Sequence, residues 1–342
     1  MAQYRSGFFH RNLRPGVILC LSLAALLLGN PGSALTRVQL YQATVPVADR
    51  SDAAQAAAFQ AAMRVVLIRV TGRRSSAGDA ALAPLVGSAG RYVQQYRATQ
   101  DNQLWVSFDG AAIERWLTQN GQPLWGHERP TTLVLLTVQT DPQSGGIVTA
   151  ADTSDLKMAI DAQAVARGLP LLWPSAADLQ KEHLDFAAMN GAGAATLADI
   201  GRRLGAEGVL MGRAAGTLAT ANVRWTHVFQ DRGGEFSGAI EGVDGAADLY
   251  ADLFAASGSL SAIEIEVTGI GDVRDYAGVQ SYLESLSSIS HVDVVALTGD
   301  TVRFRLATRG SGASLQRTLA LSGRLQPIAA GGNGVTRFQL RH

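Results

Sequence analysis

Histidines and carboxylates are the side chains in this sequence that could bind a metal or move a proton, and they are scattered along it. The histidines beyond the first residues are His127, His183, His227, His291 and His342. No two of them have the short spacing that a metal site on a helix or on neighbouring strand ends requires. His183 comes nearest to a cluster because Glu182 and Asp185 flank it, but such charged runs are usually solvated loops. The sequence therefore predicts neither a metal site nor a cofactor.

Nucleophiles are equally isolated. The G-x-S-x-G spacing of a hydrolase nucleophile elbow does not occur. Other serine triads meet only in the folded chain, so they stay open. The single cysteine, Cys20, lies in an apolar stretch near the N-terminus, and a chain processed beyond it would contain no thiol. These patterns favour a protein that is not an enzyme, with a cofactor-free hydrolase built from separate segments as the alternative.

Two pairs of residues could instead contact a partner. Arg73 and Arg74 follow Gly72, where a helix is predicted to end, and their guanidinium groups could hold an anion. Two arginines in a polar loop are more often only solvated. Trp225 and His227 share one face of a predicted hairpin strand and could form a recognition surface. The alternative is that Trp225 covers the core of its sheet.

The first 34 residues have the three parts of a cleavable secretory signal. Three arginines stand among the first 14 residues, residues 17–28 are almost wholly apolar, and small residues precede a predicted cleavage between Ala34 and Leu35. An uncleaved anchor is the alternative, but 12 apolar residues rise only about 18 Å as a helix and the hydrocarbon layer is roughly 30 Å thick. We therefore expect a periplasmic protein. Because no later stretch approaches 18 apolar residues, we expect no membrane span after cleavage.

Length and charge limit what such a processed chain could be. Residues 35–342 are too many for one typical core and suit two or three. Loss of the three leader arginines would leave three more acidic than basic residues. Nothing in that balance indicates a nucleic-acid partner.

The first predicted module, residues 35–128, alternates strands and helices. A strand is expected at 38–45, followed by a helix that Asp52 caps and Gly72 ends. Strands at 92–98 and 103–108 are joined by a polar connection that suits a hairpin, and a short helix follows at 111–119. This order predicts a small α+β layer.

The second predicted module, residues 129–258, has the order strand, helix, strand, helix, strand that is typical of an α/β sheet with parallel neighbours. Thr196 is expected to cap the second helix. The sheet should end in a hairpin whose turn is 231–234, followed by a closing helix. The ranges expected for these elements are 132–138, 156–166, 169–173, 209–211, 223–229, 235–240 and 246–255.

The third predicted module, residues 260–342, follows a predicted linker at 257–259. Its pattern reads β-α-β-β-α-β, which is the ferredoxin-like order. The last strand could be 324–328 or 335–340, because a glycine-rich stretch separates the two. The expected fold class is thus α+β and α/β, in three small modules.

A family resemblance runs through the first two modules. The stretch 104–109 (LWVSFD), continuing through Ile113 and Leu117 to Arg129-Pro130, resembles the core signature of domain-of-unknown-function family 2066. Residues 41–47 and 66–72 are similar to its opening pattern, so the likeness covers roughly 36–255. This family consists of secreted proteins of Gram-negative bacteria, which implies a periplasmic location. It implies no activity and no catalytic residues.

A second resemblance concerns the middle module alone. Residues 204–212 (LGAEGVLMG), followed by the Trp225 hairpin, are similar to the α/β domain near the start of the translocation protein TolB. Relatives of that domain are envelope assembly and binding modules, although this chain has no propeller repeat. Together these patterns predict a non-enzymatic binding or scaffold protein of the cell envelope, with an unknown envelope protein or component as its partner. The alternatives are the hydrolase named above and a carrier of a lipid or small ligand.

Overall fold

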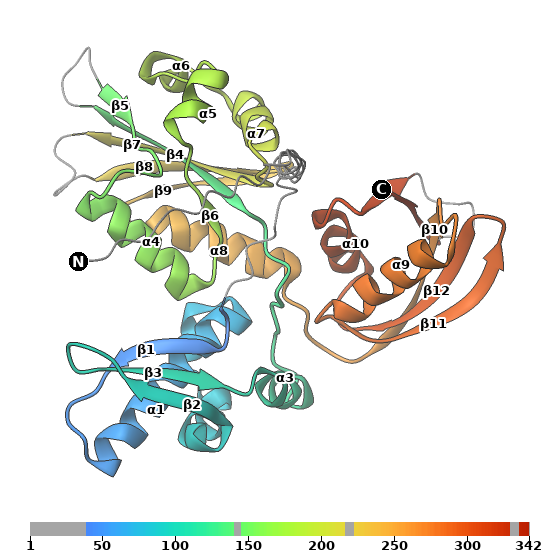
Figure 1. Cartoon of the computed structure of the whole chain (residues 1–342), viewed down its shortest axis with the longest axis horizontal. Coiled ribbons are helices and arrows are strands. Elements are labelled where there is room, and N and C mark those ends of the chain that lie inside the picture. The colour runs from blue at the N-terminus through green and yellow to red at the C-terminus, as the bar shows by residue number, and fades with distance from the viewer. Residues whose placement is uncertain (1–38, 140–144, 216–221, 329–334, 342) are drawn as a thin grey trace, which may run out of the picture. The chain divides into compact units, whose positions relative to one another are not determined.

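The computed structural model describes residues 39–139, 145–215, 222–328 and 335–341. These residues form three β-sheets with their helices, one sheet in each predicted module (Figure 1). This confirms the predicted mixture of α and β structure. The predicted leader with its cleavage site after Ala34, and His342, lie outside the described residues.

The first sheet is antiparallel, with the order β1-β3-β2. Its strands are β1 (Gln42–Pro46), β2 (Val93–Ala98) and β3 (Gln103–Phe108). Helix α1 (Asp52–Thr71) packs on one face of this sheet and buries the core side chains Met63, Val66 and Leu67 there. The other helices are η1 (Arg74–Ala77), η2 (Ala80–Leu82), α2 (Ala83–Gly87), η3 (Ala89–Tyr92) and α3 (Gly110–Gln119).

Both ends of α1 follow from local chemistry. The N-cap is Ser51, whose hydroxyl accepts a hydrogen bond from the Ala54 amide, so the prediction that Asp52 caps this helix is wrong by one residue. Asp52 instead lies in the first turn, where its charge is favourable to the helix dipole. The helix ends as predicted at Gly72, which adopts a left-handed φ of 72°.

By length and composition, α1 is the one helix within the described residues that could cross a membrane. One side of it is buried against the first sheet. Burial of this kind is what a core helix of a folded domain shows.

The second sheet has the order β5-β4-β7-β8-β9, with β6 also paired to β4. Strands β4 and β7 are parallel, as predicted, and β7, β8 and β9 are antiparallel. Helices α4 and α8 cover one face, and α6 and α7 cover the other (Figure 1). The strands are β4 (Thr132–Gln139), β5 (Gly145–Ile147), β6 (Leu171–Leu172), β7 (Gly208–Ala215), β8 (Val223–Phe229) and β9 (Arg232–Ser237). The helices are α4 (Asp155–Arg167), α5 (Ala176–Lys181), α6 (Phe186–Asn190), α7 (Ala194–Arg203) and α8 (Glu241–Phe254).

Two local predictions in this sheet are wrong. Helix α7 begins after Gly193 rather than Thr196, with no side-chain cap. The hairpin turn lies at Gln230 and Asp231, so β9 starts at Arg232 and includes the glycines that were expected to form the turn. A Cβ atom at Gly233 would lie 2.4 Å from the carbonyl oxygen of His227, which explains why glycine occupies this place inside a strand.

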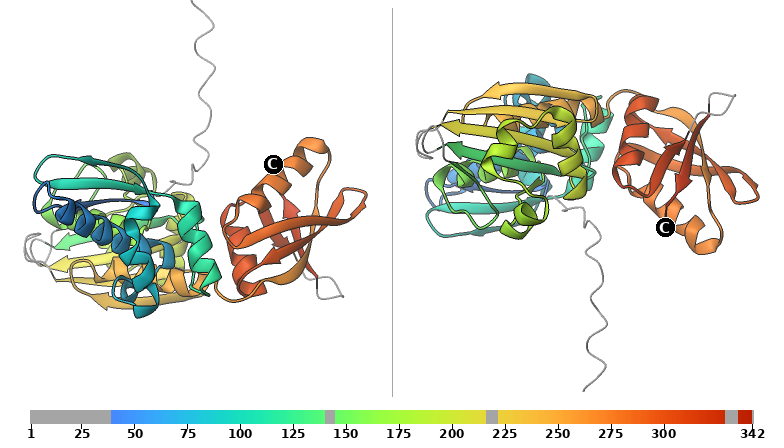
Figure 2. Two further views of the ribbon diagram at one scale, coloured as in Figure 1. Left: turned by 90° about the horizontal axis from the view of Figure 1, so that it is seen from below. Right: turned by 90° about the horizontal axis from the view of Figure 1, so that it is seen from above.

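The third sheet has the order β11-β12-β10-β14-β13. Helices α9 (Val273–Ser285) and α10 (Gly312–Leu321) pack on one face of it (Figures 1 and 2). The strands are β10 (Ser261–Thr268), β11 (Ile289–Thr298), β12 (Thr301–Thr308), β13 (Leu325–Ile328) and β14 (Thr336–Leu340). Both candidate segments for the last strand therefore form. Strand β14 lies parallel to β10, and β13 pairs outside it, whereas a four-stranded ferredoxin-like sheet has one final strand antiparallel to the first.

Candidate functional site

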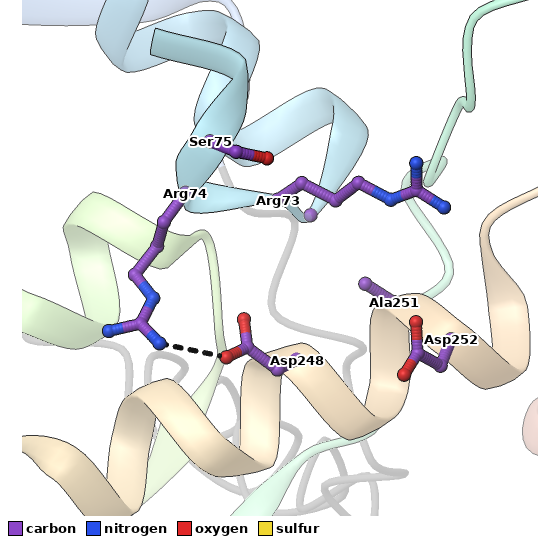
Figure 3. Close-up of a pocket in the computed structure, with 7 residues that line it drawn as sticks. Arg73, Arg74, Ser75, Asp248, Ala251 and Asp252 are labelled. Atoms are coloured by element: carbon purple, nitrogen blue, oxygen red, sulfur yellow. Dashed lines mark hydrogen bonds and ion pairs between the residues drawn. The ribbon is translucent and has the colours of Figure 1, made fainter. Parts of the chain in front are cut away.

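Arg73 and Arg74 line a pocket with a volume of about 360 Å³ (Figure 3). One wall is the segment that follows α1, and the other is helix α8. The lining residues are Gly72, Arg73, Arg74, Ser75, Asp248, Ala251 and Asp252. Of the four candidate binding residues, the structure thus brings these two together with carboxylates that the sequence analysis did not single out.

Gly72 allows the two walls to approach each other. A Cβ atom at Gly72 would lie 2.3 Å from the Cβ of Ala251 on α8 and 2.8 Å from the ring of Trp125. Any larger residue would push the end of α1 away from α8, and the left-handed φ already disfavours one. The glycine therefore places the two arginines directly over α8.

Arg74 and Arg167 bind the same two carboxylates. The Arg74 guanidinium lies 3.2 Å from Asp244 and 3.1 Å from Asp248. The Arg167 guanidinium, from the last turn of α4, lies 2.6 Å from Asp244 and 2.5 Å from Asp248. The Gln163 amide donates a further hydrogen bond of 2.8 Å to Asp244. Four charges and an amide thus join α4, α8 and the segment after α1.

Arg167 is the buried one of the two arginines in this network, with only 1% of its side chain exposed. It also donates a 2.8 Å hydrogen bond to the carbonyl of Gly72, at the C-terminal end of α1. A cation at a helix C-terminus is favourable both to the free carbonyls and to the helix dipole. Arg167 therefore joins the carboxylates of α8 to the end of α1.

Arg129 is a second buried arginine, but its hydrogen bonds go to carbonyl groups. Its guanidinium donates to the carbonyls of Arg69, Trp125, Gly126, Arg167 and Gly168. It also stacks 3.7 Å from the ring centroid of Trp125. Burial lowers the pKa of Arg129 to about 9, which leaves it charged at neutral pH. It thereby ties the last turns of α1 and α4 to the start of β4.

The rim of the pocket carries two ionic groups that the network does not use. Within the described residues, neither the Arg73 nor the Asp252 side chain has a hydrogen bond or ion pair, and both are exposed. Figure 3 shows both of them at the same pocket. A guanidinium and a carboxylate are thus free to contact a ligand or partner.

Trp225 and His227 do not form an exposed surface. Each has a relative exposure of 1%, and Trp225 donates a 2.9 Å hydrogen bond to the carbonyl of Gly238 while it packs in the core between the second sheet and α8. The proposed recognition surface on this hairpin is therefore wrong. The alternative, that Trp225 covers the sheet core, matches the packing.

His227 belongs to a buried polar cluster instead. Its Nε2 atom lies 2.9 Å from the hydroxyl of Tyr250, which lies 3.1 Å from the hydroxyl of Thr132. Burial lowers the pKa of His227 to about 4, so it is neutral at neutral pH. Burial also raises the pKa of Tyr250. The cluster joins β4, β8 and α8, and none of its three residues lines the pocket beside α8.

A second group of titratable residues surrounds the segment before β4. Tyr41 donates a hydrogen bond to Glu114 and lies edge-on to the ring of His127, with 5.9 Å between ring centroids. Burial raises the pKa of the neighbouring Glu128. The cavity beside Glu128 has a volume of only about 10 Å³, which is close to the space of one water molecule. This cavity therefore has no room for a substrate beside Glu128.

No group of three or more His, Cys, Asp or Glu side chains within the described residues could hold a metal ion. His183, the nearest to a cluster in the sequence, lies at a left-handed φ of 52° beside Glu182. Glu182 forms its ion pair with Arg203 of α7.

Fold and site together define a mixed α/β protein with a small charged pocket beside α8. Residues 34–126 match the model of a family described as a domain of unknown function, DUF8605. The chain therefore contains an uncharacterised domain over its first module. No curated protein and no solved structure matches the chain.

Proposed function

We propose that this chain is a non-enzymatic binding or scaffold protein of the cell envelope, released into the periplasm after cleavage between Ala34 and Leu35. The three-part leader supports the location. The resemblances to domain-of-unknown-function family 2066 and to the TolB N-terminal domain support an envelope role. The partner would be an envelope protein or another envelope component.

The composition of the pocket is the observation that carries this proposal. Its ionic groups are two guanidinium groups and two carboxylates, and Arg73 and Asp252 remain unpaired within the described residues. No histidine lines it, and its one hydroxyl side chain is Ser75. A serine without a neighbouring base is a weak nucleophile. This set of groups can recognise a charged partner, and it lacks the activated nucleophile and histidine base of a serine hydrolase.

Neither of the two cavities described above, in the part of the chain that the structure describes, has the lining that favours an alternative. A lipid carrier requires a large apolar cavity, whereas charged side chains line the pocket beside α8. A histidine beside a carboxylate of perturbed pKa in an exposed cleft would favour the hydrolase, whereas no histidine lines the pocket beside α8.

Photo-crosslinking from the pocket tests this proposal. A photoreactive amino acid would replace Ser75 in the full-length, exported chain, and Arg115 on α3 would serve as an exposed control site. We expect one reproducible crosslinked partner from position 75, lost in the Arg73→Ala and Asp252→Ala backgrounds and absent from position 115. Turnover of an ester or peptide panel, or crosslinks that do not depend on Arg73, would contradict the proposal.

Location is tested separately. Cell fractionation and N-terminal sequencing of the purified protein should find it in the periplasm with Leu35 as its first residue. An intact leader on protein from the cytosol would rule out the envelope role.

A further inference from the structure

Strand β11 is a free edge of the third sheet and exposes an unusual amount of apolar surface. It spans Ile289–Thr298 and has β12 as its only neighbour in the described sheet. Three of the nine exposed large apolar side chains among the described residues lie on it, with exposures of 46% for Val294, 40% for Val295 and 68% for Leu297. A long apolar edge strand can pair with another strand through its unused backbone groups.

These apolar side chains continue the core of the module. Across the sheet, Val294 faces Phe304 and Leu297 faces Val302, and both partners on β12 are fully buried. Residues directly opposite each other in a sheet point to the same face. The core-facing side of β11 therefore extends beyond the helices into solvent.

A bulge lets this strand match a second copy of itself. Asp293 and Ala296 are three residues apart and would point to opposite faces of a regular strand. The register shift between Val294 and Ala296 inserts Val295, so that Asp293 faces Arg305 and Ala296 faces Arg303 on the same open face. An antiparallel pair centred between residues 294 and 295 then places Val292 opposite Leu297 and Asp293 opposite Ala296, and the two residues of each pair share a face.

We propose that two copies of this chain associate through β11, as antiparallel edge strands related by a two-fold axis. Val294 of each copy lies opposite Val295 of the other, and Val292 lies opposite Leu297. Asp293 lies opposite Ala296, so the two carboxylates do not face each other. This contact is independent of the pocket beside α8.

The charges on the open face are complementary across such a contact. In one copy the row reads Glu264, Arg305 and Asp293, with an Arg305–Glu264 distance of 2.9 Å. In the adjoining row of the second copy, Ala296 is followed by Arg303 and Glu266, which lie 2.5 Å apart. The signs therefore alternate through the joined sheet, with one neutral residue at the junction. Because a two-fold contact is isologous, the same match occurs two times in it.

Sedimentation equilibrium of the purified full-length chain tests the proposal. We expect a monomer–dimer equilibrium whose dissociation constant rises at least about tenfold in Leu297→Glu and Val294→Glu. Val165→Glu on α4, where the native side chain is 62% exposed, is the matched control and should leave the equilibrium unchanged. A wild-type monomer at every concentration, or a dimer that neither β11 variant weakens, would overturn the proposal.

Engineered cysteines test the register in the same protein. In a Cys20→Ser background, Asp293→Cys combined with Ala296→Cys should form an intermolecular disulfide on mild oxidation, because the two positions lie opposite each other. Each single variant should form far less. Equal crosslinking by the singles and the double variant would contradict this register, and an edge occupied by a different protein would leave all three uncrosslinked.

Discussion

The network around Asp244 and Asp248 has two ends, the exposed end at Arg74 and the buried end at Arg167. The two ends differ in their surroundings rather than in their chemistry. Arg74 and Arg167 bind the same two carboxylates at distances between 2.5 and 3.2 Å. The Arg74 side chain is 58% exposed, whereas Arg167 is 1% exposed. Water can replace the contacts of the first arginine but not those of the second. Similar ion pairs are therefore expected to stabilise this protein very unequally.

The comparison also separates structure from recognition. The buried end joins α1, α4 and α8, and the Arg167 guanidinium itself is inaccessible to a partner. The exposed end lies at the rim of the pocket, where Arg73 and Asp252 are unpaired within the described residues. We therefore assign stability to the buried end and propose binding for the rim.

Removal of the buried arginine should have the largest effect. Arg167→Ala leaves Asp244 buried and the Gly72 carbonyl without its hydrogen bond, so the free energy of unfolding should fall by about 3–5 kcal/mol. Urea unfolding followed by circular dichroism measures this loss. Arg202→Ala, which breaks an ion pair with Asp199 in which both side chains are more than half exposed, is the control and should cost less than about 1 kcal/mol. A loss of less than about 1 kcal/mol for Arg167→Ala would contradict the distinction between the two ends.

The pH dependence of stability tests the burial of His227, a polar side chain that has no counter-charge. The folded-state pKa of His227 is lowered to about 4, below its ordinary value of 6.5, so the unfolded chain takes up the proton first as the pH falls. The stability associated with His227 is complete above about pH 6.5, and about 3 kcal/mol of it is lost as the pH falls to 4. His227→Gln keeps a polar group next to Tyr250 but does not titrate. Unfolding curves from pH 7 to pH 4 should therefore be flatter for this variant, and parallel curves would contradict burial of His227.

The Arg129→Lys variant tests whether hydrogen-bond geometry or positive charge matters at the second buried arginine. A lysine keeps the charge but cannot donate hydrogen bonds to five carbonyls at once or stack flat on Trp125. We expect a loss of about 2–3 kcal/mol in the free energy of unfolding, from the loss of charged hydrogen bonds to buried carbonyls. Thermal unfolding monitored by calorimetry would detect it. An unchanged midpoint would show that a positive charge alone suffices there.

Arg74→Ala should have the smallest effect. Because Arg167 still neutralises both aspartates, the free energy of unfolding should change by less than about 1 kcal/mol, and less still in high salt. Urea unfolding at low and high salt provides the measurement. A loss as large as that of Arg167→Ala would mean that the exposed arginine is a structural part of the network.

The sequence predicted most elements because their signals are local. Hydrophobic periodicity and turn residues located the strands of the three sheets except the short β5, and Gly72 was identified as the end of α1. Errors fell where two neighbouring residues could serve the same role, as with Ser51 and Asp52 at the start of α1. The final pairing of the third sheet depends on contacts between distant strands, which no local pattern encodes.

The site was only half predictable. Arg73 and Arg74 stand out as a pair in the sequence, but the partners of Arg74 on α8 are 170 and 174 residues away along the chain. Arg167 and Asp244 are single charges at the end or the start of a helix, where charged residues are common, so nothing marks them as buried. For Trp225 and His227 the error was the opposite one, because they were proposed as an exposed surface and are buried. Alternation along a strand shows which residues share a face but not which face is covered.

Two double-mutant cycles that share Asp244 test the central claim most directly. One combines Asp244→Asn with Arg167→Ala, and the other combines it with Arg74→Ala, with the free energy of unfolding measured for every variant. We predict a coupling energy of at least about 2 kcal/mol for Arg167 and below about 0.5 kcal/mol for Arg74. Equal couplings would contradict the claim that burial, rather than the ion pair itself, divides this network into a structural end and a binding end.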